Sequence, residues 1–272
     1  MPSIQPDVFM MEGAKFDFSI ESNKDMMFDD VAGDQMKMET NTPADQHLQP
    51  QHHPEANGMP PPAVNGICDV EPVMFVEPAY WCQIMYYELG KQVGTFNGRP
   101  RAITIDGYVD PCSPDRLCLG QFSNPERSPQ VDDTRRHIGK GVRLWYIGGE
   151  VHVECLSQCA IWVQSLNCNT RFGWHPLTVV KIPPGNHLNI FSNSEFAKTL
   201  NQAVQQGYKA VYNVQNACSI RMSFAKGWGA EYKRQRITDC HCWVEIHLNG
   251  PLQWLDRVLS TMPSTEQTGS GT

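Results

Sequence analysis

Short stretches in which apolar and polar residues alternate recur along the chain from about residue 77 onward. They are rich in β-branched and aromatic residues and are separated by turn residues, which is the pattern of half-buried β-strands. In the last stretch, 242–248, every even-numbered residue is apolar and is expected to face a core. Seven strands are predicted, at 102–109, 142–147, 151–155, 160–166, 187–191, 219–224 and 242–248. Many short strands at this spacing predict a mainly β fold of the sandwich type.

Two segments instead show a helical period. The first is 195–206, where Ser192 and Glu195 have the spacing of a capping box and Gly207 is a natural stop. Its expected apolar face consists of Phe196, Leu200, Ala203 and Val204. The second helix is predicted to begin with Asn249 as its cap and Pro251 in its first turn. Its apolar stripe consists of Leu252, Leu255, Val258, Leu259 and Met262.

Charge divides the chain into two regions. Residues 1–78 carry three lysines and fourteen acidic residues, a net charge of −11, whereas 79–272 carry nineteen basic and fifteen acidic residues, a net charge of +4. The first region is polar and Pro-rich, so 1–76 is predicted to be a disordered acidic leader, 77–262 the folded domain and 263–272 a flexible tail. An inert tail is a simpler interpretation of His47, His52 and His53 than a metal site. No signal sequence or membrane span is recognised, which predicts an intracellular, soluble protein.

The ten cysteines are expected to stay reduced in that compartment. Cys155 with Cys159, or Cys240, His241 and Cys242 together, could suggest zinc. However, Cys155 and Cys242 fall in alternating stretches, which favours small buried strand side chains over metal ligands. No metal or other cofactor is therefore expected.

We find no catalytic motif, so the protein is not expected to be an enzyme. Asp106, Asp110 and Asp115 could form a carboxylate site, but "DGYVDPCSPDR" has the residues of a turn-rich connection, and Arg116 can pair with these carboxylates. A structural or interface role is favoured.

The strongest candidate for a binding site is the stretch "SFAKGWGAEYKRQRITDCHCWVEI", 223–246. Its first half is a basic, glycine-punctuated loop, and glycines allow a ligand close to the backbone while Arg and Lys suit phosphate. The loop cations are Lys226, Lys233, Arg234 and Arg236, and a second basic cluster contains Arg135, Arg136, Lys140 and Arg143. A solvated basic face and a nucleic-acid surface are the alternatives, although a net charge of +4 is weak for the latter.

Motifs in family order show a resemblance over about 79–262. They include "YWCQIMYYEL", "CLGQFSN", "RRHIGKGVRL", "NCNTRFGWHP", "KIPPG", "RMSFAKGWGAEYKRQ" and "NGPLQWLD". The chain resembles the MH2 domain of the Smad family, and "NCNTRFGWHP" with "KIPPG" is most similar to the receptor-regulated Smads of the activin/TGF-β branch. The resemblance implies a FHA-like β-sandwich with a helix bundle at one end and a loop–helix region at the other.

The resemblance also implies roles for particular residues. Its basic loop would hold a phosphorylated serine tail through Lys181, Lys226, Tyr232 and Arg234. Subunit-interface positions would be Asp106, Asp110 and Arg116, and the partner-peptide surface would be Phe172 and Trp174. Lys233 and Arg236 would belong to the receptor-specificity loop, although Arg236 replaces a smaller residue of the activin branch. The candidate phosphorylation sites Thr268, Ser270 and Thr272 stand where the family has Ser-Ser-x-Ser.

The function implied is transmission of a TGF-β/activin-type receptor signal from the cytoplasm to the nucleus. The implied partners are a common-mediator Smad and other Smads in a hetero-oligomer, expected to be a trimer, together with a type I receptor serine/threonine kinase and transcription factors and co-regulators. An inhibitory Smad is the alternative. The MH1 domain is not recognised in this sequence, so direct sequence-specific DNA binding is not expected, and neither is membrane insertion.

Overall fold

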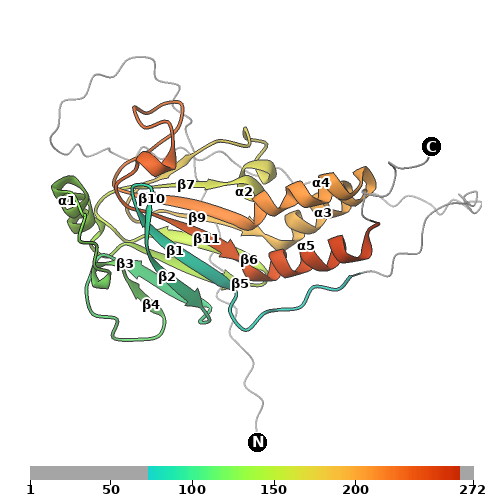
Figure 1. The fold of residues 1–272 in the computed structure, drawn as a ribbon, viewed down its shortest axis with the longest axis horizontal. Coiled ribbons are helices and arrows are strands. Elements are labelled where there is room, and N and C mark those ends of the chain that lie inside the picture. The colour runs from blue at the N-terminus through green and yellow to red at the C-terminus, as the bar shows by residue number, and fades with distance from the viewer. Residues whose placement is uncertain (1–72, 264–272) are drawn as a thin grey trace, which may run out of the picture. The chain divides into compact units, whose positions relative to one another are not determined.

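The computed structural model describes residues 73–263, in which eleven strands form two sheets packed as a β-sandwich (Figure 1). All strand pairs are antiparallel except β3 with β4. The six-stranded sheet has the order β2 (Lys91–Gly98), β1 (Cys82–Glu88), β11 (Trp243–Leu248), β10 (Ser219–Phe224), β7 (Ile161–Ser165) and β8 (Val180–Ile182). The five-stranded sheet has the order β4 (Arg116–Cys118), β3 (Ala102–Asp106), β5 (Val142–Ile147), β6 (Glu150–Cys155) and β9 (His187–Ser192).

The core consists of the inward-facing residues of both sheets. In the six-stranded sheet, Ile84, Ile246 and Ile220 lie in register on adjacent strands, and all three are fully buried. In the other sheet, Leu144 pairs with Val153 in the same way. Burying each such side chain contributes about 1.5–3 kcal/mol, so this alternation of apolar residues is what selects the sandwich.

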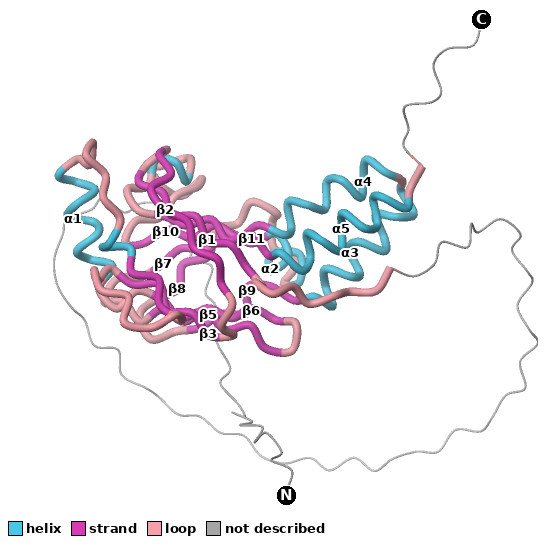
Figure 2. Tube along the Cα trace, turned by 60° about the horizontal axis from the view of Figure 1, so that its bottom comes forward, coloured by secondary structure: helices cyan, strands magenta, loops and turns pink. Residues whose placement is uncertain are grey.

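Helices lie at the two ends of the sandwich (Figure 2). At one end are α2 (Leu166–Arg171), α3 (Asn193–Gln206), α4 (Tyr208–Asn213) and α5 (Asn249–Thr261), the last three packed as a bundle. At the other end is α1 (Pro129–Ile138). Single 3₁₀ turns are η1 (Leu119–Gln121), η2 (Val214–Cys218) and η3 (Ile237–Asp239).

The seven predicted strands are confirmed, and five of them have corrected ends, with the largest change in β3. β3 ends at Asp106 because Gly107 turns away to donate to the Gly139 carbonyl at 2.9 Å, so residues 107–109 belong to a loop. Cys155 and Cys242 are buried, as their alternating stretches predicted.

The two predicted helices are also confirmed, with corrections at their ends. Ser192 precedes α3, but its hydroxyl bonds to that of Ser194 at 2.9 Å, and Glu195 pairs with Lys198 at 2.7 Å, so the predicted capping box does not form. Val204 is 37 % exposed and does not belong to the buried face. Asn249 is the first residue of α5 rather than its cap, and its amide donates to the Tyr80 carbonyl at 2.9 Å.

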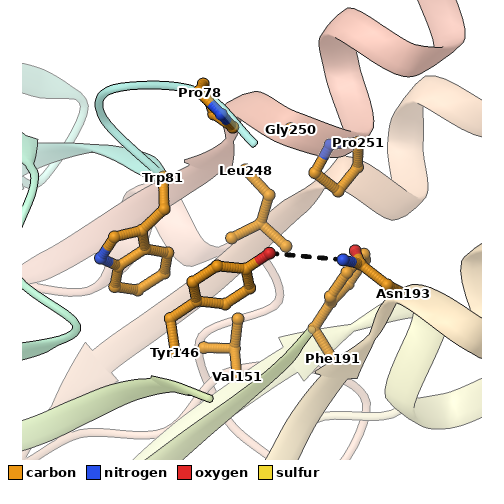
Figure 3. A pocket seen from close by; sticks show the side chains of 9 residues that line it. All are labelled: Pro78, Trp81, Tyr146, Val151, Phe191, Asn193, Leu248, Gly250 and Pro251. Carbon is orange, nitrogen blue, oxygen red and sulfur yellow. Dashed lines mark hydrogen bonds between the residues drawn. The ribbon is translucent and has the colours of Figure 1, made fainter. Parts of the chain in front are cut away.

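A small pocket beside Tyr146 lies where the sandwich meets the helix bundle (Figure 3). The Tyr146 ring stacks on Trp81 at 5.2 Å, and its hydroxyl accepts a 3.3 Å hydrogen bond from Asn193 at the start of α3. Nearby, Trp254 of α5 donates to the Val73 carbonyl at 2.7 Å. Packed structure therefore begins within the segment that the sequence placed in the leader.

Candidate functional site

The loop between β10 and β11, residues 225–242, is anchored on the outer face of the six-stranded sheet. Side chains alternate along a strand, so Trp162 and Trp243 point away from the sandwich core that Val163 and Val244 fill. Loop side chains cover both indoles and form a second buried cluster. Its members are Trp162, Trp228, Ile237, Cys240 and Trp243.

Strand register places Lys181 beside this cluster. Lys181 in β8 lies directly opposite Trp162 in β7, and directly opposite residues share a face with Cβ atoms about 5 Å apart. Trp162 Nε1 donates a 2.6 Å hydrogen bond to the Tyr232 hydroxyl, with the rings edge to face at 6.0 Å. Lys181 and Tyr232 are therefore neighbours of the same indole.

Gly227 makes this approach possible. A Cβ atom at this position would lie 2.6 Å from Trp162 Nε1 and 2.7 Å from the Tyr232 ring, closer than atoms can pack. Gly227 is one of the glycines that the sequence placed in the basic loop. The close contact between the loop and the sheet therefore requires a glycine at this position.

Backbone bonds fold the two ends of the loop together. Gly229, with φ of +108°, donates to the Arg234 carbonyl at 2.8 Å, which closes the tip. At the base, the Lys226 carbonyl accepts from Ser223 Oγ at 2.6 Å and from Cys240 Sγ at 3.7 Å. Residues on both sides of the loop therefore lie close in space.

The positive charges of Lys226 and Arg234 both act on His241. Burial lowers the pKa of His241, and the positive charges of Arg234 and then Lys226 lower it further. Within residues 73–263, Lys181, Lys226 and Arg234 form no ion pair with a carboxylate. Cations without a carboxylate partner are suited to an anion, because charge-assisted hydrogen bonds to a phosphate are strong.

The other basic residues are arranged differently. Lys233 is exposed, while Arg236 pairs with Asp239 at 3.1 Å. In the second basic cluster, the three arginines have partners within the chain. Arg135 lies by Glu88, Arg136 pairs with Asp132 at 2.7 Å, and Arg143 lies over the Trp145 ring at 5.6 Å. These pairings do not favour the nucleic-acid alternative.

Sequence reasoning missed a buried carboxylate, Glu88 at the end of β1. Its oxygens lie 2.9 Å from Arg127 Nε, 3.5 Å from Arg135 Nε and 2.7 Å from Asn124 Nδ2. The missed helix α1, which carries Arg135, had its own signals in the sequence: Ser128 caps it, Pro129 is its first residue, and Gly139 follows it with φ of +52°.

The predicted subunit-interface residues lie around the β3–β4 connection. The buried carboxylate of Asp106 accepts from Arg116 Nη2 at 2.7 Å and Nε at 3.0 Å, so these two residues pair within the chain, as the sequence allowed. Asp110 is exposed, and so are its neighbours Tyr108 and Val109.

The predicted partner-peptide residues lie side by side after α2. Phe172 stacks on Trp174 with ring centroids 4.7 Å apart. Phe172 is 44 % exposed, whereas Trp174 is half-buried and packs against the sandwich core. Phe172 is thus available at the surface, whereas Trp174 supports it from below and contributes to the core packing.

Other predicted features concern metals, membranes and the chain ends. Among the residues that the structure describes, no group of three or more His, Cys, Asp and Glu is arranged to hold a metal ion. No helix in the described part has the length and apolar character to cross a membrane. His47, His52 and His53, and the phosphorylation candidates Thr268, Ser270 and Thr272, lie outside the described residues.

Comparison with known families identifies the domain. The model of the MH2 domain family matches residues 79–249. The chain therefore belongs to the MH2 domain family, and at this level its function is Smad-like signalling through protein–protein interaction.

Two solved structures are similar to this chain at low identity. The crystal structure of the interferon regulatory factor 9 IAD domain is 11 % identical, covers 70 % of this chain and 94 % of its own, and has a TM-score of 0.51. A chain from the crystal structure of STAT2 in complex with IRF9 is 12 % identical, covers 66 % of this chain and 97 % of its own, and has a TM-score of 0.47. The first likeness supports the fold alone.

Proposed function

We propose that this chain transmits a TGF-β/activin-type receptor signal by binding the phosphorylated serine tail of another Smad in its basic loop. It acts in the cytoplasm, moves to the nucleus on signalling, and regulates transcription through partner proteins, with a type I receptor kinase upstream. Two observations support the proposal. Lys181 and Tyr232 are neighbours of the Trp162 indole, and none of the cations Lys181, Lys226 and Arg234 pairs with a carboxylate within residues 73–263.

A peptide titration tests the proposal. The purified chain is titrated with a fluorescent peptide ending in Ser-x-Ser, with both serines phosphorylated, and with the same peptide unphosphorylated. We expect binding of the phosphorylated peptide only. Because a hydrogen bond to a charged group contributes about 1.5–3 kcal/mol, Arg234→Ala and Lys226→Ala should each weaken binding by roughly 10-fold or more.

Matched controls separate the site from general charge. Arg236→Ala removes a cation two residues from Arg234 that is already paired with Asp239, and Lys198→Ala removes one paired with Glu195 in α3. Both should bind the phosphopeptide nearly as well as the unaltered chain. Equal losses in all four variants would mean that only net charge matters, and the site would be rejected.

An inhibitory role is the second candidate, favoured by the glycine spacing of Thr268, Ser270 and Thr272, which is a poor copy of Ser-Ser-x-Ser. The two roles differ in cells. Loss of the gene should weaken a TGF-β-type reporter if the chain transmits the signal, and strengthen it if the chain inhibits.

A further inference from the structure

His241 lies at the base of the basic loop, between its cations and helix α1. Residues 240–242 run beside the start of the loop, since Cys240 Sγ contacts the Lys226 carbonyl at 3.7 Å and the Phe224 amide donates to the Cys242 carbonyl at 3.1 Å. From α1, Thr134 Oγ1 lies 2.8 Å from His241 Nδ1. The imidazole is half-buried and held on one side by this contact.

The hydrogen-bond network assigns the ring tautomer. Thr134 Oγ1 has one proton and donates it to the Gln130 carbonyl, 3.0 Å away and one turn back in α1. The threonine oxygen can then only accept from His241, so Nδ1 carries the proton of the neutral ring. In the described part of the chain no group is hydrogen-bonded to Nε2, which leaves this nitrogen for a ligand.

Charges on two elements face the ring. Arg234 and Lys226 of the loop oppose its protonation, as burial does first of all, whereas Asp133 of α1 favours it. The pKa of His241 is thereby lowered from its ordinary value of 6.5, so the ring is neutral at pH 7 in the empty site. An anion bound by Lys226 and Arg234 would offset their repulsion and favour a proton on Nε2.

We propose that His241 is a further ligand of the anion site, donating from Nε2–H to the phosphate that Lys226 and Arg234 hold, so that binding tightens as pH falls. The proton comes from solvent. The inference rests on the proposed function of the loop as a phosphate-binding site. The sign follows from linkage: binding is coupled to uptake of a proton, so affinity rises as pH falls through the range between the pKa of the bound and the empty state.

Inorganic sulfate is the probe that isolates the protein's contribution, because sulfate stays a dianion where phosphate itself titrates. Calorimetric titration of the full chain between about pH 8 and pH 5.5 spans the range in which a histidine changes charge. A pKa rise of about one unit on binding corresponds to roughly 10-fold tighter binding at the acidic end. His241→Gln should bind sulfate at pH 8 like the unaltered chain but lose the gain at low pH.

His137→Gln is the matched control, since His137 lies on α1 with an exposed side chain and a bond from its ring to the Asp133 carbonyl. It should keep the full pH dependence. In proton NMR, the ring resonance missing from His241→Gln identifies His241, and its titration should move to higher pH when sulfate is added.

Two results overturn the inference while leaving the proposed function intact. One is an Arg234-dependent sulfate affinity that does not change with pH, and the other is the same pH dependence in His241→Gln. By contrast, sulfate and phosphopeptide binding that survives both Arg234→Ala and Lys226→Ala, or is absent altogether, would reject the loop as the anion site and the inference with it.

Discussion

Arg234 and Arg236 lie two residues apart in one loop and differ in what surrounds them. Arg236 is paired with Asp239 at 3.1 Å, whereas Arg234 shares its surroundings with Lys226 and His241 and has no carboxylate partner within residues 73–263. A cation that is already paired gains little from a phosphate. Residue type alone counts both arginines as basic, so only the structure separates the candidate ligand from its neighbour.

The aromatic pair after α2, Phe172 and Trp174, also consists of two similar residues with different surroundings. We expect Trp174→Ala to lower the free energy of unfolding by about 2–3 kcal/mol, because its ring packs against the core and its loss leaves a cavity. Phe172→Ala should lower it by about 1 kcal/mol or less, since the exposed ring mainly stacks on Trp174. Urea denaturation measures both.

Leu177→Ala is the control for this pair, because Leu177 is 70 % exposed in the same loop, and it should leave unfolding unchanged. If Trp174→Ala unfolds at the same urea concentration as the control, the tryptophan is a surface side chain like Phe172. A partner-peptide role would then be open to both rings rather than to Phe172 alone.

At the scale of elements, the sequence predicts strands well where one face is apolar and the other polar. In 242–248 the alternation gives both the strand and its buried face. It fails for β1, where Ile84, Met85, Tyr86 and Tyr87 are all apolar or aromatic and no face stands out, although only Ile84 and Tyr86 are buried. Helix α1 was missed for another reason. Its residues Arg135 and Arg136 were interpreted as part of a basic cluster, and the helical signals around them were not used.

The burial of Trp243 could likewise not be predicted from the sequence. Trp243 lies on the face opposite the sandwich core, and it is buried because the loop covers it and Tyr87 stacks on it at 4.1 Å. The candidate site depends on contacts of this kind between distant segments. The loop sequence indicates its own cations, and the resemblance adds Lys181. The register of β7 with β8 then shows that Lys181 lies beside Trp162, on which the loop packs.

Glu88 links β1 to α1 and the segment before it, so its charge should govern the stability of that end. Glu88→Gln leaves Arg127 and Arg135 without a buried counter-charge and should lower the free energy of unfolding by about 3 kcal/mol. Glu126→Gln removes a carboxylate from an exposed pair with Lys91 and should change it little. Urea denaturation compares the two, and equal effects would contradict a structural role for the buried cluster.

The loop as an element depends on Gly227. Gly227→Ala forces the Tyr232 ring away from Trp162, so phosphopeptide affinity should fall by roughly 10-fold or more, about the contribution of one hydrogen bond to a charged group. Gly90→Ala, where an added Cβ meets no atom within 4 Å, should bind normally. The titration described above measures both variants. Normal binding by Gly227→Ala would show that the contact between loop and sheet is not needed for the site.

At the scale of the whole molecule, the exposed loop cations repel those of any second MH2 domain brought close to them. A phosphorylated tail from a neighbour relieves this repulsion through charge-assisted hydrogen bonds. Under the proposed function, the candidate site is the receiving half of such a contact. Assembly is therefore expected to depend on a tail that carries suitably spaced phosphates.

This chain should accept such a tail more readily than its own segment 268–272 docks on another MH2 domain. Thr268, Ser270 and Thr272 are separated by glycines, which increase the entropy lost when a tail docks. Mixed with a Smad whose terminal serines are phosphorylated, the chain should form a hetero-oligomer, and Lys226→Ala or Arg234→Ala should prevent it. Light scattering after size-exclusion chromatography measures the mass of each species. If receptor-kinase treatment of this chain alone phosphorylates Ser270 and yields a stable homotrimer, it donates a tail as well as it accepts one, and the preference is wrong.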